Sequence, residues 1–314
     1  MNLLNVFDTF GTEIIELASD GFFYPSDSIL ASGVVEMLPL TAADEDMLSS
    51  GNLLKRNLVL PRILTRILPA VTNIDEILHC DVVSILLNAR ILNYGSTNTI
   101  KSKCANCSNE FEHEVSFGFK PIPFSFAGLH RGRNVLGFVL PRSGKFVAFR
   151  LPTWREHLHR NSVGWIEHIK NLTLSIEDEP DISEFYNNLC SGFDSRALRE
   201  YIDLRTPGFV TKWTSKCPEC GNTTTTSLDI TTDIFNIRPE SKSVIHDEIF
   251  SLCYHTNGGF TQDSVYNMPT KLRNFYLKKL VDLKNDENEQ TKKREAEVKA
   301  MSKTSGKPSG PMGK

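Results

Sequence analysis

The sequence predicts an α+β fold with two related strand–helix modules, a C-terminal pair of helices and a charged tail. Three observations predict it. The segments 103–109 and 216–222 share the pattern Lys-Cys-x-x-Cys-x-Asn. The residues that follow each cysteine pair suggest a strand, most clearly by alternation after the first pair. Apolar residues elsewhere recur at helical spacing. With 314 residues, of which 40% are apolar and 23% charged, the chain can form two domains with real cores.

The first module is expected to span residues 1–125. Acidic residues at 44–46 favour a helix start just after Thr41, because they face the positive end of the helix dipole. Gly95 favours a helix end. Strands are predicted at 12–17, 34–40 and 111–119, and helices are predicted to begin at Thr41, Pro61 and Asn73, the last of them ending at Gly95.

The second module is expected to span residues 126–240 and to repeat this order. A strand, turn and strand at 138–146 lead to a helix from Thr153 through Ile169, and a further helix covers 194–204. The offset that places Cys104 on Cys217 also places Asp81 on Asp194 and Ser102 on Ser215. These matches predict an internal duplication, with each module ending in a zinc-ribbon-like hairpin.

The third region, residues 241–283, is predicted to be a helical hairpin with a second helix that begins at Pro269. Four apolar side chains share one face of that second helix and are candidates for partner binding, although packing in the chain's own core is preferred: Leu272, Phe275, Tyr276 and Leu280. Residues 284–314 are rich in Lys and Glu and then in Gly, Pro and Ser, which predicts a disordered, charged tail. The mixed charges of its first part also suggest a solvated helix extension.

The cysteines point to a metal. There are seven, an odd number in a long chain, which argues against a secreted disulfide scaffold. A spacing of two residues lets one tight turn present two thiolates to one ion, so each pair supplies half of a tetrahedral site. We therefore expect one structural Zn²⁺ per chain, which joins the two modules through Cys104, Cys107, Cys217 and Cys220.

Three other interpretations of the cysteine pairs remain. The pairs could be metal-free relics, or two separate sites, with His113 completing the first. Thr226 stands at the position equivalent to His113 and does not support the second idea. Thioredoxin-like redox chemistry would need a helix after the first cysteine, whereas strand-like sequence follows. Cys80, Cys190 and Cys253 are expected to be core thiols.

Composition and missing motifs exclude several function classes. The net charge of −3 and the pI near 6.3 argue against duplex DNA as a partner. The sequence has no apolar run long enough for a bilayer, and residues 1–8 lack the basic segment and apolar run of a signal peptide, so we expect a soluble, intracellular chain. It also lacks a phosphate-binding loop and a serine elbow, so we expect no enzyme and no small-molecule substrate. His157 and His168 are expected on a solvated helix face. A zinc-ribbon module that binds nucleic acid or assists transcription stays as the alternative function, although acidic residues after the first pair oppose it.

Several segments, in this order, carry a family resemblance: 21–25, 37–41, each cysteine pair after its helix, 229–235, 249–260, 266–269 and 272–276. Together they resemble the baseplate hub assembly family of T-even-type contractile-tailed bacteriophages, over most of residues 10–283. The resemblance implies a non-enzymatic hub subunit or assembly chaperone whose partners are other hub and tail proteins. It implies a location in the host cytoplasm during assembly or in the virion tail baseplate. The tail after Lys284 has no counterpart in that pattern.

Overall fold

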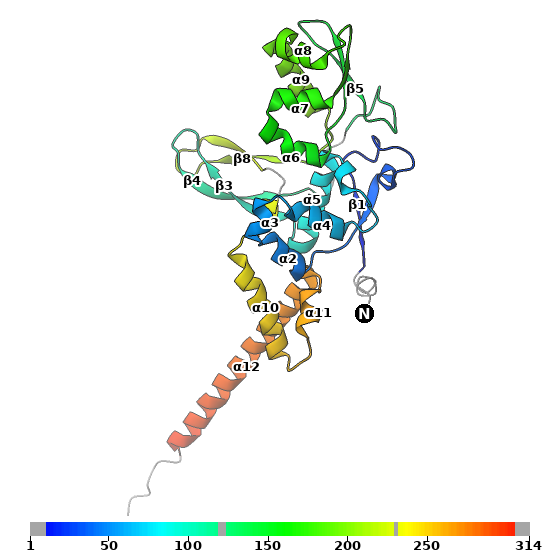
Figure 1. Cartoon of the computed structure of the whole chain (residues 1–314). Helices are drawn as coiled ribbons and strands as arrows, with labels where there is room; N and C mark the ends of the chain where they lie inside the picture. The colour runs from blue at the N-terminus through cyan, green and yellow to red at the C-terminus, as the bar shows by residue number, and fades with distance from the viewer. Residues whose placement is uncertain (1–10, 119–123, 229–231, 305–314) are drawn as a thin grey trace, which may run out of the picture.

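The computed structural model describes residues 11–118, 124–228 and 232–304. Helices and small antiparallel sheets are mixed, which confirms the α+β class. In Figure 1 the helices α7 to α9 lie at one end of the molecule, two β-hairpins extend to one side, and α10 to α12 lie at the other end. The resemblance segment 229–235 falls partly, at 229–231, outside the described residues.

The N-terminal part begins with an antiparallel pair, β1 (Glu13–Glu16) and β2 (Val34–Met37), with the 3-10 helix η1 (Ile29–Ser32) between them. Four α-helices follow: α2 (Ala42–Leu48), α3 (Gly51–Lys55), α4 (Val59–Ile67) and α5 (His79–Tyr94). The predicted start of α2 is confirmed, because the amide of Thr41 donates to Asp44 at 2.6 Å. Residues 74–76 form only a 3-10 turn, η2 (Ile74–Glu76), so α5 starts later than predicted and ends at Gly95 as expected.

Residues 136–204 again combine a small sheet with helices. Strands β5 (Leu136–Val139), β6 (Phe146–Phe149) and β7 (Thr173–Ile176) form one antiparallel sheet in that order. The helix predicted from Thr153 to Ile169 is divided into α6 (Trp154–Val163) and α7 (Trp165–Leu172). Gly164 lies between them with φ 82°, a conformation that ends a helix at low cost only for glycine. Then come α8 (Ile182–Glu184), the π-helix η3 (Phe185–Leu189) and α9 (Gly192–Leu204).

Each cysteine pair lies in the turn of a two-stranded antiparallel hairpin. The first hairpin is β3 (Thr97–Lys103) with β4 (Glu110–Ser116). The second is β8 (Lys212–Lys216) with β9 (Thr223–Ser227), and the 3-10 helix η4 (Thr232–Phe235) comes after it. The hairpins extend side by side from the body, and β3 contacts β9.

Two buried aspartates that the sequence offset aligns make similar contacts. Asp81, at the start of α5, accepts from the amide and hydroxyl of Ser19 at 2.8 and 2.7 Å and from the hydroxyl of Tyr24 at 2.7 Å. Asp194, at the start of α9, accepts from two successive amides of the β5–β6 turn at 2.7 and 3.2 Å. A buried carboxylate requires such donors. Each aspartate thereby ties the helix before a hairpin to the loop that follows the first strand of its half.

One hydrophobic core runs from Ile15 to Phe235 and takes side chains from both predicted modules. A second, smaller core lies between α2 and the C-terminal helices α10 (Ser241–His255), α11 (Gln262–Tyr266) and α12 (Thr270–Thr304). The boundary between the two modules at residue 125 therefore stays a prediction from the sequence, because a single core contains residues from both sides of it. The C-terminal helices have apolar packing of their own.

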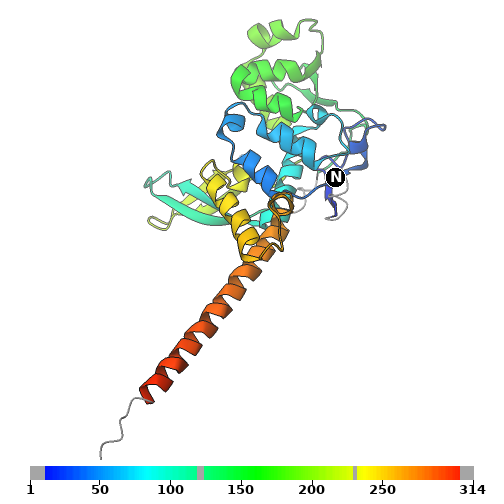
Figure 2. The same ribbon diagram turned by 60° about the horizontal axis from the view of Figure 1, so that its bottom comes forward.

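The expected disorder after Lys284 is wrong for residues 284–304, where α12 continues as a helix; residues 305–314 lie outside the described part. In Figures 1 and 2 this helix projects away from the body. Lys, Glu, Gln and Ala are strong helix formers, and pairs such as Lys284 with Glu287 at 2.8 Å add support along the helix. The intrinsic helix propensity of these residues, and not burial of an apolar face, therefore stabilises this part of α12.

A buried ion pair fastens the C-terminal helices to the body. Arg273 of α12 is 2% exposed and contacts both Glu45 of α2 and Glu248 of α10. Glu45 is 3% exposed and also accepts from the hydroxyl of Tyr94 at 2.6 Å. One guanidinium therefore balances the buried carboxylate of Glu45 and the half-buried carboxylate of Glu248, which come from different helices.

We expect Arg273→Ala to lower the free energy of unfolding by about 3–5 kcal/mol, because it leaves buried carboxylates without a counter-charge. Urea denaturation of the full chain measures the change. The matched control is Arg155→Ala, which removes an exposed ion pair with Asp75 and should cost no more than about 1 kcal/mol. Equal losses in the two variants would contradict the account.

Candidate metal centre

The first cysteine pair is held by a short turn between β3 and β4. The amide of Cys104 donates to the carbonyl of Asn109 at 2.9 Å, and the amide of Ser108 donates to the carbonyl of Cys104 at 2.9 Å. Ser108 has φ 59°, a left-handed conformation that closes the turn. These bonds fix the backbone that carries both sulfurs.

The second pair is held by the same turn. The amide of Cys217 donates to the carbonyl of Asn222 at 2.9 Å, and the amide of Gly221 donates to the carbonyl of Cys217 at 2.9 Å. Gly221 has φ 70° and takes the place of Ser108 at less conformational cost. The shared Lys-Cys-x-x-Cys-x-Asn pattern thus corresponds to one backbone geometry, formed twice.

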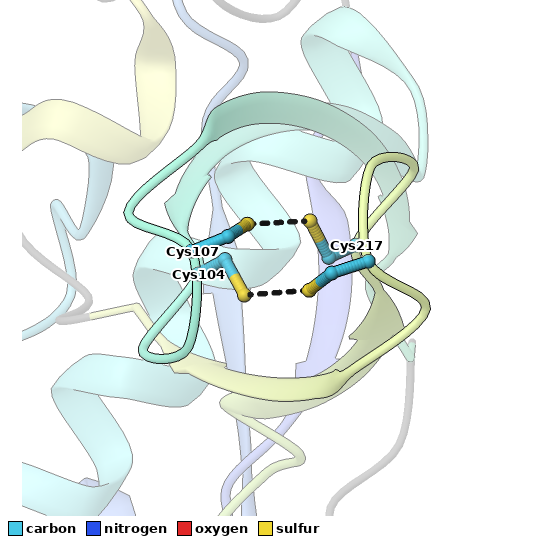
Figure 3. Close-up of side chains that lie close together, drawn as sticks. Cys104, Cys107 and Cys217 are labelled. Atoms are coloured by element: carbon cyan, nitrogen blue, oxygen red, sulfur yellow. Dashed lines mark hydrogen bonds between the residues drawn. The ribbon is translucent and has the colours of Figure 1, made fainter.

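The two turns bring four sulfur atoms together within 4.8 Å of one another. Figure 3 shows the sulfurs of the two loops facing each other. Sγ of Cys104 lies 3.6 Å from Sγ of Cys220, and Sγ of Cys107 lies 3.6 Å from Sγ of Cys217. A tetrahedral zinc with bonds near ~2.3 Å needs sulfurs about 3.8 Å apart, and a disulfide needs about 2.05 Å. The spacing fits four ligands of one ion.

The thiols differ in exposure. Cys104 is 1% exposed and Cys217 is 2% exposed, whereas Cys107 and Cys220 reach the surface. The first cysteine of each pair is therefore inside and the second is outside. Among the described residues, these four cysteines are the group that could hold an ion, and four protein ligands complete a closed tetrahedral shell.

Backbone amides favour a thiolate at each inner sulfur. The amides of Cys107 and Asn106 lower the pKa of Cys104 to about 6. Desolvation acts to raise the pKa of Cys217, but the amides of its own turn outweigh it and the pKa is lowered. The turn geometry thus prepares the two buried sulfurs for a cation.

The outer sulfur of the first pair behaves differently. The amide of Asn109 acts to lower the pKa of Cys107, but desolvation and the neighbouring sulfurs outweigh it and raise the pKa to about 12. Thiolates at this spacing repel one another, which favours the protonated form of Cys107 in the absence of a cation.

A polar layer lies between the hairpins. The hydroxyls of Ser102 and Thr226 are 2.5 Å apart, and Ser102 also contacts Nδ1 of His113 at 3.2 Å. Nε2 of His113, the hydroxyl of Ser215 and the hydroxyl of Thr224 are buried, and no described side chain or backbone group bonds them. This layer was not expected from the sequence, because its members are ordinary alternate residues of strands. His113 belongs to it and not to the sulfur group.

The other cysteines and histidines do not join this centre. Cys80 is buried, and Cys190 and Cys253 are half-buried, all outside the sulfur group. The expected solvated face is wrong for His168, which is 5% exposed because α7 turns it toward the body. The ring of His157 stacks on that of His79, 3.4 Å between centroids.

The predicted partner-binding residues fall into two groups. Tyr276 and Leu280 pack against the smaller core, and the ring of Tyr276 lies 5.0 Å from that of Phe260. Leu272 and Phe275 instead line a groove of about 380 Å³ between β2, the end of α5 and the start of α12, which we term the α12 groove. Of the four, Phe275 is exposed and the other three are half-buried, and partner binding stays a prediction.

One comparison with known proteins identifies a family. No curated protein and no solved structure matches the chain. Among the described residues, no helix is long and apolar enough to cross a membrane. The family of the T4 bacteriophage base plate protein matches residues 24–236, which is more than half of the chain and includes both hairpins. The chain therefore belongs to the T4 bacteriophage base plate protein family, with a structural role in the phage tail and other tail or baseplate proteins as its neighbours.

Proposed function

We propose that the protein is a non-enzymatic subunit of the baseplate hub, or a chaperone that assembles it, in which one structural Zn²⁺ joins two duplicated modules. Family membership supports the baseplate role, and the sequence segments that resemble hub assembly proteins support the hub. The observation that carries the zinc is the meeting of four sulfurs from two distant hairpins at the spacing of a tetrahedral shell.

The symmetry of the sulfur contacts between the two hairpins supports the duplication. The offset that takes Cys104 to Cys217 takes Cys107 to Cys220, so it converts each of the two close sulfur contacts into the other. Both contacts are 3.6 Å, as a two-fold relation between the hairpins requires. The two turns share their hydrogen bonds, and Asp81 and Asp194 tie corresponding helices to corresponding loops.

The proposed ion is structural and not catalytic. All four ligands would come from the protein, so no position is left for water or substrate. The hairpins otherwise meet through the rings of Phe117 and Trp213, 5.7 Å apart, and through the polar layer, in which three buried polar atoms have no partner among the described residues. Such unpartnered groups weaken the contact between the hairpins. The ion would supply on the order of 10 kcal/mol to hold the hairpins together.

A nucleic-acid role receives less support. The exposed face of the first hairpin carries Glu110, Glu112 and Glu114 opposite Lys101 and Lys103, and Lys101 pairs with Glu112 at 3.7 Å. Three carboxylates beside two lysines leave this face without the basic excess that binding to phosphate needs.

Elemental analysis of the purified full chain tests the site. We expect one zinc per chain and its loss in Cys104→Ser and in the double variant Cys217→Ser with Cys220→Ser, because each removes ligands from a shared shell. Cys253→Ser is the matched control, a half-buried cysteine outside the group, and it should keep the metal. Zinc that persists in the double variant would exclude a site shared between the hairpins.

Zinc binding should release protons. At pH 7 the ion must displace at least the proton of Cys107, whose pKa is about 12. Below about pH 6 Cys104 also holds a proton, so more protons are released and the affinity falls. Calorimetric titration of zinc into metal-free protein in two buffers of different ionisation enthalpy measures the number. Identical binding heats in both buffers, with affinity unchanged on acidification, would contradict the sulfur ligation.

Mass spectrometry of base plates separates subunit from chaperone. A hub subunit should be present both in assembly intermediates from infected cells and in purified virions. A chaperone should be present in the intermediates alone. Absence of the chain from both would overturn the hub proposal, whatever its zinc content.

A further inference from the structure

We propose that the α12 groove and the face of α12 that continues from it form a docking surface for an acidic amphipathic helix of a neighbouring baseplate protein. This inference rests on the baseplate role and does not depend on the zinc. The groove is apolar where β2, α5 and α12 meet, and Met37, Leu92, Pro269, Leu272 and Phe275 line it. The side chain of Phe275 is 52% exposed at its edge.

The apolar surface continues outward along α12. Leu272, Phe275, Lys279 and Leu283 follow one another at steps of three or four residues, so they share one face of the helix. Leu283 is 60% exposed and lies beyond the part of α12 that packs on the body. The neighbouring face, with Tyr276 and Leu280, is already covered by the smaller core. A stripe at this spacing fits the apolar face of another helix.

The charges beside the apolar stripe indicate which kind of helix can bind there. Lys271 and Lys278 are exposed beside the stripe and Lys279 lies within it, with its ammonium 5.8 Å from the ring centre of Phe275. Arg273 is buried and neutralised, so it does not contribute to the surface. The acids at the margin are Glu13 on the opposite wall, with Asp282 and Asp286 at the distal end. The flank along α12 is therefore basic, and the complementary partner carries Asp or Glu beside its apolar stripe.

The position of α12 leaves room for a second helix to bind along it. The helix leaves the body and is exposed along its outer length, so a second helix can lie along it without a clash with the hairpins. Burial of Phe275 and Leu283 by a partner would remove two large apolar side chains from water, the usual source of helix-in-groove affinity.

Photo-crosslinking in assembled base plates tests the surface. The full chain carries benzoylphenylalanine in place of Phe275, and a matched chain carries it in place of Val281, which is 56% exposed on the opposite side of the same helix. Base plates are isolated from infected cells and irradiated, and the crosslinked peptides are sequenced. We expect position 275 to crosslink to an acidic segment of another baseplate protein with apolar residues three and four apart, and position 281 not to do so.

Other occupants give distinct results. A crosslink from position 275 to residues 1–10 of the same chain, to a second copy of the chain, or to a basic segment overturns the proposal, as does the absence of any crosslink. Detection of the chain in the same base plates separates these failures from a failure of the baseplate role, in which the chain itself would be missing.

Charge reversal supplies an independent check. Lys271→Glu combined with Lys279→Glu should lower the crosslink yield at position 275 by at least about tenfold, because like charges would then face each other. Lys292→Glu combined with Lys293→Glu changes the charge of α12 equally but far from the groove, and should leave the yield unchanged. Equal effects of the two pairs would overturn the charge argument. Unchanged circular dichroism and melting of each variant establish that it is folded.

Discussion

The rest of the structure depends on one constraint: two β-hairpins lie side by side and their cysteine turns face each other. One hairpin follows α5 and the other precedes the C-terminal helices, so the contact ties together segments more than a hundred residues apart. Closing so long a loop costs entropy, and the partly unsatisfied polar layer between the strands contributes little to offset it. Four thiols poised at the spacing of a tetrahedral ion offer a direct way to offset that cost.

The buried polar contacts are of two kinds: some join elements within the main core, and one joins the C-terminal helices to it. Asp81 and Asp194 each join a helix start to a loop within one half of the main core. Arg273 with Glu45 joins the C-terminal helices to α2. Burial of such groups is costly unless donors and acceptors match, so they fix one arrangement of helices more than they add stability. Apolar packing supplies the stability, and the polar contacts select the geometry.

Local signals predicted the cysteine site and many secondary-structure elements. The repeated Lys-Cys-x-x-Cys-x-Asn pattern identified both turns, and Thr41 with Asp44 marked the start of α2. What local signals missed was set by tertiary contacts. Gly164 breaks one predicted helix through its positive φ, and β7 forms because β6 offers it an edge. The layer of Ser102, His113 and Thr226 required knowledge of which strands face each other. Low apolar content suggested disorder after Lys284, where helix propensity prevailed.

The length of α12 has a mechanical consequence. Its 35 residues, at 1.5 Å of rise per residue, make a rod about 50 Å long that is clamped at one end only. A small rotation at the Arg273 clamp is multiplied into a large displacement at the tip. A neighbour that grips the outer part of the rod would therefore sense, or impose, small changes in how the clamp sits on α2. In a baseplate, such a lever would couple the orientation of the body to a partner that contacts the rod alone.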